Sequence, residues 1–276
     1  MSHENPRAPS VPLEKLPREH AAIAVLAELA CEDDPAAKTE RVWLIVPKDG
    51  PRPKPGSLLL AGGPPIGVDE TTRPTFEGAF MHHLLTIDLE RTPELRRFPR
   101  FAEARAFAVF MADHEDNDAS RPGTKETAVV ALSESDLKKG DWKGPDVDDP
   151  PRTPFDLIAI DVPVTAFDAA KLETVGAFDF NSLDAPATRE DDRKKLRAML
   201  REFAVAHAKT KEARVAALRA ELMNNDHLGG QVIHFAKDAY ETDFLGQFTE
   251  DLLPELCLGD AGTFYVFADT AFWIGH

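Results

Sequence analysis

The sequence predicts an α+β fold with two related β-rich segments, about 42–113 and 228–269, an N-terminal helix and a long helical segment between them. Two observations lead to this prediction. Runs of β-branched and aromatic residues bounded by Gly and Pro are typical of strands, and the stretch between the segments places apolar residues at helical spacing. We call 42–113 the first β segment and 228–269 the second β segment. One domain over residues 13–276 is expected, because a chain of this length can bury a large core.

The individual elements follow from local patterns. Apolar residues recur three and four positions apart within His20–Cys31, which predicts a helix. Thr188 precedes a second helical pattern whose apolar stripe begins at Leu196 and continues to Leu222, so one long helical segment is expected there. Continuous apolar or alternating runs predict strands at Val42–Val46, Ala128–Leu132 and Asp156–Val162.

The two β segments contain similar motifs in the same order. The matching blocks are Leu60–Gly63 with Leu228–Gly230, Leu84–Asp88 with Leu245–Thr249, and Phe107–Asp113 with Thr263–Asp269. An internal duplication would produce this order. Strands joined by glycine turns can also resemble one another by chance, so both explanations stay open.

The same residues resemble the YwqG-like family over about 47–269. The resemblance rests on Gly-Gly-Pro-Pro at 62–65, Leu-Leu-Thr-Ile-Asp-Leu at 84–89, and Gly-Asp-Ala-Gly followed by an aromatic strand at 259–267. It implies a mixed α and β fold without an established activity, and some relatives look like immunity or antitoxin-type proteins. Family members usually carry Gln in the first hydrophobic run, where this chain has Thr86, whereas the second run keeps Gln247.

The charge of the chain favours basic partners. Its formal net charge is −16, and an acidic surface repels the phosphate backbone of nucleic acid. Residues 112–150 contain eleven Asp and Glu against five Lys and Arg, which predicts an exposed acidic insertion. An acidic surface can also serve solubility alone. The candidate partner-binding residues are Asp113, Glu115, Asp116, Asp118, Asp146, Asp148 and Asp149.

Residues 189–219 are locally basic, with ten Lys and Arg against five Asp and Glu. We expect this helical face to pack beside the acidic β segments. A nucleic-acid or membrane surface is less well supported, because the apolar stripe is narrow and aromatic residues do not interleave with the charges. The sequence therefore predicts neither a nucleic-acid nor a membrane partner.

Signatures of catalysis are missing from the sequence. There is no GxSxG turn, and the His114-Glu115 pair lacks the second His of HExxH. His82 and His83 would point to opposite faces of a strand, so they do not form a metal pair. We predict no catalytic residue, no metal ligand and no cofactor. Polar candidates for ligand binding remain at Gln247, Asp251 and Asp260, although turn and strand-end hydrogen bonds would also explain these residue types.

The compartment is predicted from cysteine usage. Cys31 and Cys257 are too few for a disulfide framework, and neither a signal peptide nor a membrane-spanning stretch is evident, so we expect a cytoplasmic protein. Closely spaced prolines predict a flexible leader over residues 1–12.

Two functions agree with these observations. The first is a non-enzymatic cytoplasmic binding protein, of the immunity or antitoxin type, that holds a basic partner through acidic loops. The alternative is an enzyme or small-ligand-binding protein with a pocket between the two β segments.

Overall fold

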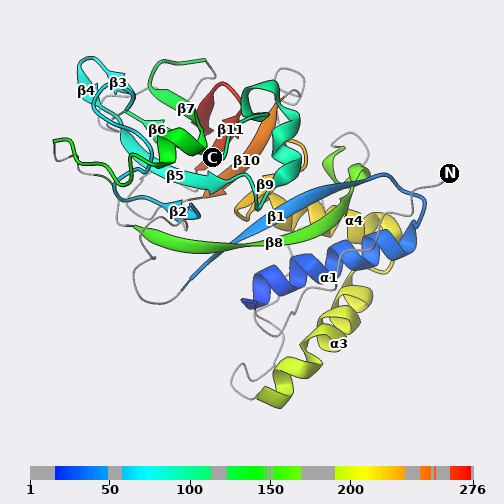
Figure 1. Ribbon diagram of the computed structural model, residues 1–276. Coiled ribbons are helices and arrows are strands. Elements are labelled where there is room, and N and C mark those ends of the chain that lie inside the picture. The colour runs from blue at the N-terminus through cyan, green and yellow to red at the C-terminus, as the bar shows by residue number, and fades with distance from the viewer. Residues whose placement is uncertain are drawn as a thin grey trace. The chain divides into compact units, whose positions relative to one another are not determined.

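A computed structural model describes residues 16–48, 58–112, 123–145, 147, 149, 152–168, 190–233, 243–249, 252 and 262–274 (Figure 1). Helices and strands are both present, in agreement with the predicted α+β class. The chain divides into two compact units. Unit 1 comprises Met1–Val46, Ile158–Asn225 and Gly230–Lys237, and unit 2 comprises Pro47–Leu157, Asp226–Gly229 and Asp238–His276. The predicted leader at 1–12, the cap at Thr188 and the turn at 259–261 lie outside the described residues.

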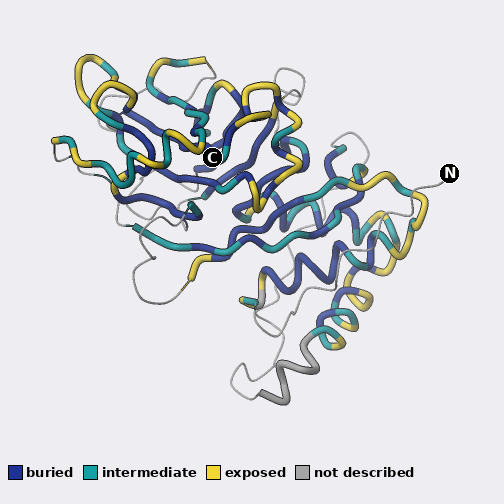
Figure 2. Tube along the Cα trace, viewed as in Figure 1, coloured by how far each residue is buried: buried dark blue, intermediate teal, exposed yellow. Residues whose placement is uncertain are grey.

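Unit 1 is built around a helix whose middle is buried. Its elements are α1 (Arg18–Asp33), β1 (Thr39–Pro47, up to Val46), the second half of β8 (Thr153–Pro163), the 3-10 helix η5 (Val164–Phe167), α3 (Glu190–His207) and α4 (Lys211–Met223). Residues Ala21–Ala27 of α1 are all buried, as the dark tube in Figure 2 shows. These small and branched side chains pack with Leu200 of α3 and Leu218 of α4 in one hydrophobic cluster. The helix and strands predicted here are confirmed, with slightly longer bounds.

The long helical segment that the sequence predicted is present, and it consists of two helices. α3 ends at His207 and α4 begins at Lys211. Thr210 provides the physical reason, because its side-chain oxygen accepts a hydrogen bond from Ala213 N at 3.1 Å and caps the second helix.

The basic side chains of α3 and α4 pair with the carboxylates at the end of α1. The pairs are Arg197–Glu28 at 2.7 Å, Arg201–Glu32 at 2.6 Å, Lys211–Asp34 at 2.6 Å and Arg214–Asp33 at 2.6 Å. The expected packing of this face beside the acidic β segments stays a prediction. Among the described residues, the carboxylates in these four pairs come from α1 and from Asp34, the residue after it, within unit 1.

Unit 2 contains two antiparallel series of four strands. The first series runs β2 (Leu60–Ala61), β5 (His82–Asp88), β6 (Ala106–Met111) and β7 (Thr127–Leu132). The second runs β9 (His227–Gly229), β10 (Phe244–Thr249), β11 (Thr263–Phe267) and β12 (Ala271–Ile274). Shorter elements are the β3 (Thr75–Phe76) and β4 (Ala79–Phe80) hairpin, the 3-10 helices η2 (Pro93–Arg97) and η3 (Pro99–Phe101), and α2 (Glu134–Leu137).

The two series agree in detail at their glycine pairs. Gly62 and Gly63 follow β2 with φ of 64° and 68°, and Gly229 and Gly230 stand at the end of β9 with φ of 73° and 74°. Left-handed backbone at two consecutive positions strongly favours glycine, so the glycine pair has the same physical role in both series.

The strand registers agree as well. A bulge interrupts β5 between His83 and Leu85, and another interrupts β10 between Phe244 and Gly246. After each bulge, the first residue of the bulged strand pairs with a valine of the next strand. The second residue to pair is Thr86 in the first series and Gln247 in the second. This register matches Phe107 with Phe264. The block alignment read from the sequence, which matched Phe107 with Thr263, is therefore wrong by one residue.

The last strands of the two series meet. Thr127 Oγ1 of β7 donates a hydrogen bond to Ala271 O of β12 over 2.6 Å, and Gly123 N donates to Thr270 Oγ1 over 2.9 Å. Hydrogen bonds between these edge strands reduce the number of unpaired backbone groups that they would otherwise present to solvent.

Candidate functional site

A buried ion pair lies beside β5 in unit 2. Arg73 Nη2 donates to Asp149 Oδ1 over 2.7 Å, and the two side chains are 0% and 4% exposed. Asp149 Oδ1 also accepts the backbone N–H of His83 over 2.7 Å. Arg73 Nε and Nη2 both donate to Met81 O, over 3.1 and 2.7 Å. The guanidinium is therefore held in place by the backbone carbonyl of Met81 as well as by the Asp149 carboxylate.

The His83 ring is completely buried between the glycine turn and Thr86. Its Nδ1 lies 2.8 Å from Gly63 O, and its Nε2 lies 2.8 Å from Thr86 Oγ1. A carbonyl can only accept, so Nδ1 carries the hydrogen and Nε2 accepts from the threonine hydroxyl. Burial lowers the pKa of His83 below its usual value, because a charged ring loses its hydration there. The ring is therefore neutral at pH 7.

We expect the stability of the protein to fall as the pH drops below about 6.5, the ordinary pKa of His. In that range His83 binds a proton in the unfolded chain but not in the folded chain, so unfolding is favoured. One such group changes the free energy of unfolding by at most about 1.4 kcal/mol per pH unit.

The measurement is denaturant unfolding between pH 4.5 and 7.5 for the wild type and His83→Gln. The variant should show a shallower pH dependence than the wild type, because it lacks the buried imidazole. Equal slopes in the two proteins would contradict the assignment.

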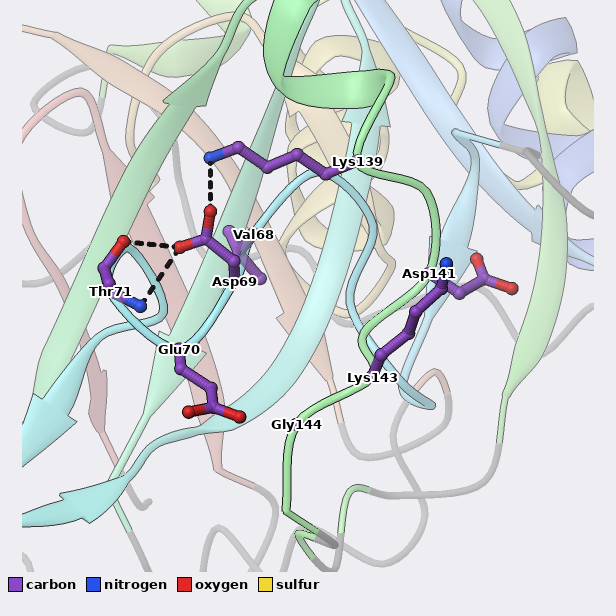
Figure 3. A pocket seen from close by; sticks show the side chains of 8 residues that line it. All are labelled: Val68, Asp69, Glu70, Thr71, Lys139, Asp141, Lys143 and Gly144. Carbon is purple, nitrogen blue, oxygen red and sulfur yellow. Dashed lines mark hydrogen bonds and ion pairs between the residues drawn. The ribbon is translucent and has the colours of Figure 1, made fainter.

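An open pocket of about 330 Å³ lies in unit 2 between the loop after Ile66 and the loop after α2 (Figure 3). Most of its lining side chains are polar or charged. They are Val68, Asp69, Glu70, Thr71, Lys139, Asp141, Lys143 and Gly144. Its volume is at the lower end of the range for small-molecule sites, and charged groups stand beside apolar surface in its lining.

Asp69 organises one wall of this pocket. Its carboxylate accepts hydrogen bonds from Thr71 N at 3.0 Å and Thr71 Oγ1 at 2.6 Å, and it pairs with Lys139 Nζ at 3.1 Å, as the dashed lines in Figure 3 show. The hydrogen bonds from Thr71, followed by those from Lys139 and Thr72, hold the pKa of Asp69 below its usual range. This wall is therefore a turn with a fixed, ionised carboxylate, which can interact with a small polar group.

The structure describes only some of the predicted site residues. Gln247 is completely buried on β10, opposite His227 of β9 and Tyr265 of β11. Its role in ligand binding stays a prediction. Asp251 and Asp260 lie outside the described residues, as do Asp113, Glu115, Asp116, Asp118, Asp146 and Asp148.

Asp149 requires a correction. We predicted an exposed carboxylate available to a partner, but only 4% of its side chain is exposed and it is bound by Arg73 and His83 N. An acidic sequence context predicts exposure on average, because isolated carboxylates are costly to bury. The prediction failed here because Arg73, 76 positions earlier, provides the compensating charge.

Sequence reasoning did not identify Arg73, His83 or Thr86 as members of one cluster. Arg73 stands in a polar loop beside Pro74, which is an ordinary context for an exposed cation. The available signal was weaker and concerned His83 alone, because an odd-even strand pattern places one histidine of the His82-His83 pair on the buried face.

Among the described residues, no group of three or more His, Cys, Asp or Glu side chains could hold a metal ion. No described helix combines the length and the apolar character needed to cross a membrane. No protein-family model matches the chain, and no curated protein sequence matches it.

Proposed function

We propose that this protein is a non-enzymatic, cytoplasmic binding protein that holds a basic protein partner, such as a toxin, through its acidic segments. The observation that carries this proposal is the distribution of charge. The net charge is −16, and four cations of the basic helices are paired with α1 carboxylates inside unit 1. These cations are already neutralised, so the surplus of carboxylates remains available to an external cation.

The acidic surplus is dense in the segment that links β6 to β7. Asp113, Glu115, Asp116 and Asp118 fall within six positions of sequence, with Arg121 as the nearest cation in the chain. Carboxylates so close together repel one another, and a cationic partner relieves this repulsion. Asp146 and Asp148 provide a second short acidic stretch, whereas Asp149 is occupied within the fold.

We also propose that the two β segments arose by internal duplication and that the chain is a member of the YwqG-like family. The duplication is supported by the paired left-handed glycines, the matching bulges and the matching registers of the two strand series. The family proposal rests on the sequence motifs at 62–65, 84–89 and 259–267. Both proposals concern ancestry, and neither names a ligand.

The experiment compares partner capture by three proteins. In the loop variant, Asp113, Asp116 and Asp118 become Asn and Glu115 becomes Gln. In the matched control, four exposed carboxylates elsewhere are neutralised, namely Glu94, Glu103, Glu202 and Asp269. Each protein is immobilised and incubated with lysate of its native cell at low and at physiological salt.

We expect the wild type and the control to capture the same basic protein, and to capture more of it at low salt, because exposed charge pairs strengthen as screening falls. The loop variant should bind about fourfold or more weakly, since four exposed pairs contribute about 0.2–1 kcal/mol each. Equal capture by the loop variant, or no captured protein at either salt, would count against the proposal.

A small-ligand-binding protein is the second candidate. The pocket beside Asp69 and Lys139 favours it, because fixed opposite charges line a space of about 330 Å³. This pocket is formed by residues 68–71 and 139–144 of the first part of unit 2. The capture experiment separates the two functions, since loss of four carboxylates from the β6–β7 link should leave ligand binding at this pocket unchanged.

A further inference from the structure

The cluster around Arg73 has the features of a ligand site whose ligand comes from the chain itself. Arg73 is oriented by groups other than Asp149. Its Nε and Nη2 reach Met81 O, its backbone N donates to Asp69 O over 2.8 Å, and its Cζ lies 4.7 Å from the centre of the Trp142 ring. A guanidinium fixed in this way is ready to receive an anion before the anion arrives.

The second donor is also fixed independently. His83 N belongs to β5, next to the bulge, and the strand pairs with β6 on both sides of that bulge. It points at Asp149 Oδ1 over 2.7 Å. A guanidinium nitrogen and a backbone N–H that converge on one oxygen form the kind of charge-assisted arrangement that selects carboxylates.

One donor of the site is still unused. Arg73 Nη1 is buried, and no described residue accepts a hydrogen bond from it. A buried guanidinium hydrogen without an acceptor is unfavourable, so the site has capacity for a further oxygen atom. Asp149 fills the site through Oδ1, which receives both of the hydrogen bonds described above.

The described residues of the segment that carries Asp149 make few hydrogen bonds. Among the described residues of 143–149, the hydrogen bonds that reach the β5 region are those to the Asp149 carboxylate. The other bonds are local, from Asp149 N to Val147 O and from Trp142 Nε1 to Pro145 O. The carboxylate is therefore held by the site more than by its own backbone.

We propose that Arg73 and the His83 N–H form a preformed binding site for a small carboxylate, and that Asp149 fills this site as a built-in ligand. The site accepts a free monocarboxylate when the Asp149 side chain is absent. It lies on the first β segment, and its chemistry is independent of the acidic segments that bind a basic partner.

Chemical rescue of Asp149→Ala by formate tests the proposal. The substitution removes a carboxylate group of the size of formate and leaves the donors in place. Thermal unfolding is measured in sodium formate and in sodium chloride at equal ionic strength. We expect formate to raise the Tm of Asp149→Ala by about 2–4 °C more than chloride, because a ligand that binds only the folded state stabilises it.

Two controls make the result specific. Asp161→Ala removes the partner of Arg41 at a site where the side chains are 26% and 35% exposed, so water replaces the lost carboxylate and formate should act no differently from chloride. The double variant Arg73→Met with Asp149→Ala should also lose the formate effect. A formate response of the same size in the wild type, in Asp161→Ala or in the double variant would overturn the proposal.

The test remains decisive if Asp149→Ala is unfolded in chloride. The variant is then refolded from denaturant with increasing formate, and the recovery of its circular dichroism signal is followed. Recovery with formate, but not with chloride, supports the site. If the wild type refolds and the variant does not recover at any formate concentration, the proposal is wrong.

Discussion

Replacing Arg73 by Met is expected to lower the free energy of unfolding by about 3–5 kcal/mol, the typical cost of removing one partner of a buried ion pair. The substitution leaves Asp149 96% covered and without its counter-charge, because the exposed fraction of that side chain is 4%. It also removes the two hydrogen bonds to Met81 O. Chemical denaturation followed by circular dichroism measures the loss.

A matched surface pair provides the control. Arg41→Met breaks a bond of the same length, 2.7 Å from Nε to Asp161 Oδ1, but the side chains are 26% and 35% exposed. We expect a change below about 1 kcal/mol there. The double variant Arg73→Met with Asp149→Leu should recover much of the loss, since it removes both buried charges. Similar losses from Arg41→Met and Arg73→Met would show that burial does not set the cost.

Gly230→Ala should destabilise unit 1 by about 3 kcal/mol, from left-handed backbone strain of about 1–2 kcal/mol and overpacking of about 1–3 kcal/mol. Gly230 has a φ of +74°, and an added Cβ would lie 2.7 Å from Phe167 Cζ and 3.1 Å from Val42 Cγ2. Phe167 is completely buried in the hydrophobic cluster of unit 1. Equilibrium unfolding, with the signal of the helices as readout, measures the effect.

Gly78→Ala separates the two causes. Gly78 also has a positive φ, +89°, but no atom lies within 4 Å of its added Cβ. This control should show only the backbone cost, about 1–2 kcal/mol. If both variants lose the same stability, the close approach to Phe167 is not a source of destabilisation.

Local patterns in the sequence were enough to predict most of the regular elements. The helix at His20–Cys31 and the strands at Val42–Val46, Ala128–Leu132 and Asp156–Val162 all lie within the observed α1, β1, β7 and β8. Periodicity is a local property, and apolar residues at the right spacing define one face of an element wherever it packs. The break before α4 was not predicted, because it depends on a single capping hydrogen bond at Thr210.

The candidate site was far less predictable. Gln247 was singled out and is buried in the register position that corresponds to Thr86. The cluster of Arg73, His83 and Asp149 was not predicted. In the structure, the Arg73 guanidinium and the His83 N–H both lie within hydrogen-bonding distance of the Asp149 carboxylate. Their partners are 66 and 76 positions apart, so no pattern in a short window connects them.

The sequence was enough to predict the α+β class, the positions of the main helices and strands, the glycine pairs at 62–63 and 229–230, and the excess of negative charge. Each of these depends on composition or on the spacing of nearby residues. The tertiary structure was needed to establish three other features. These are the one-residue correction to the alignment of the two strand series, the pairing of the basic helices with α1, and the burial of Asp149. These depend on which distant groups compensate one another, because a charge or a polar group enters the interior only where the fold provides its partner.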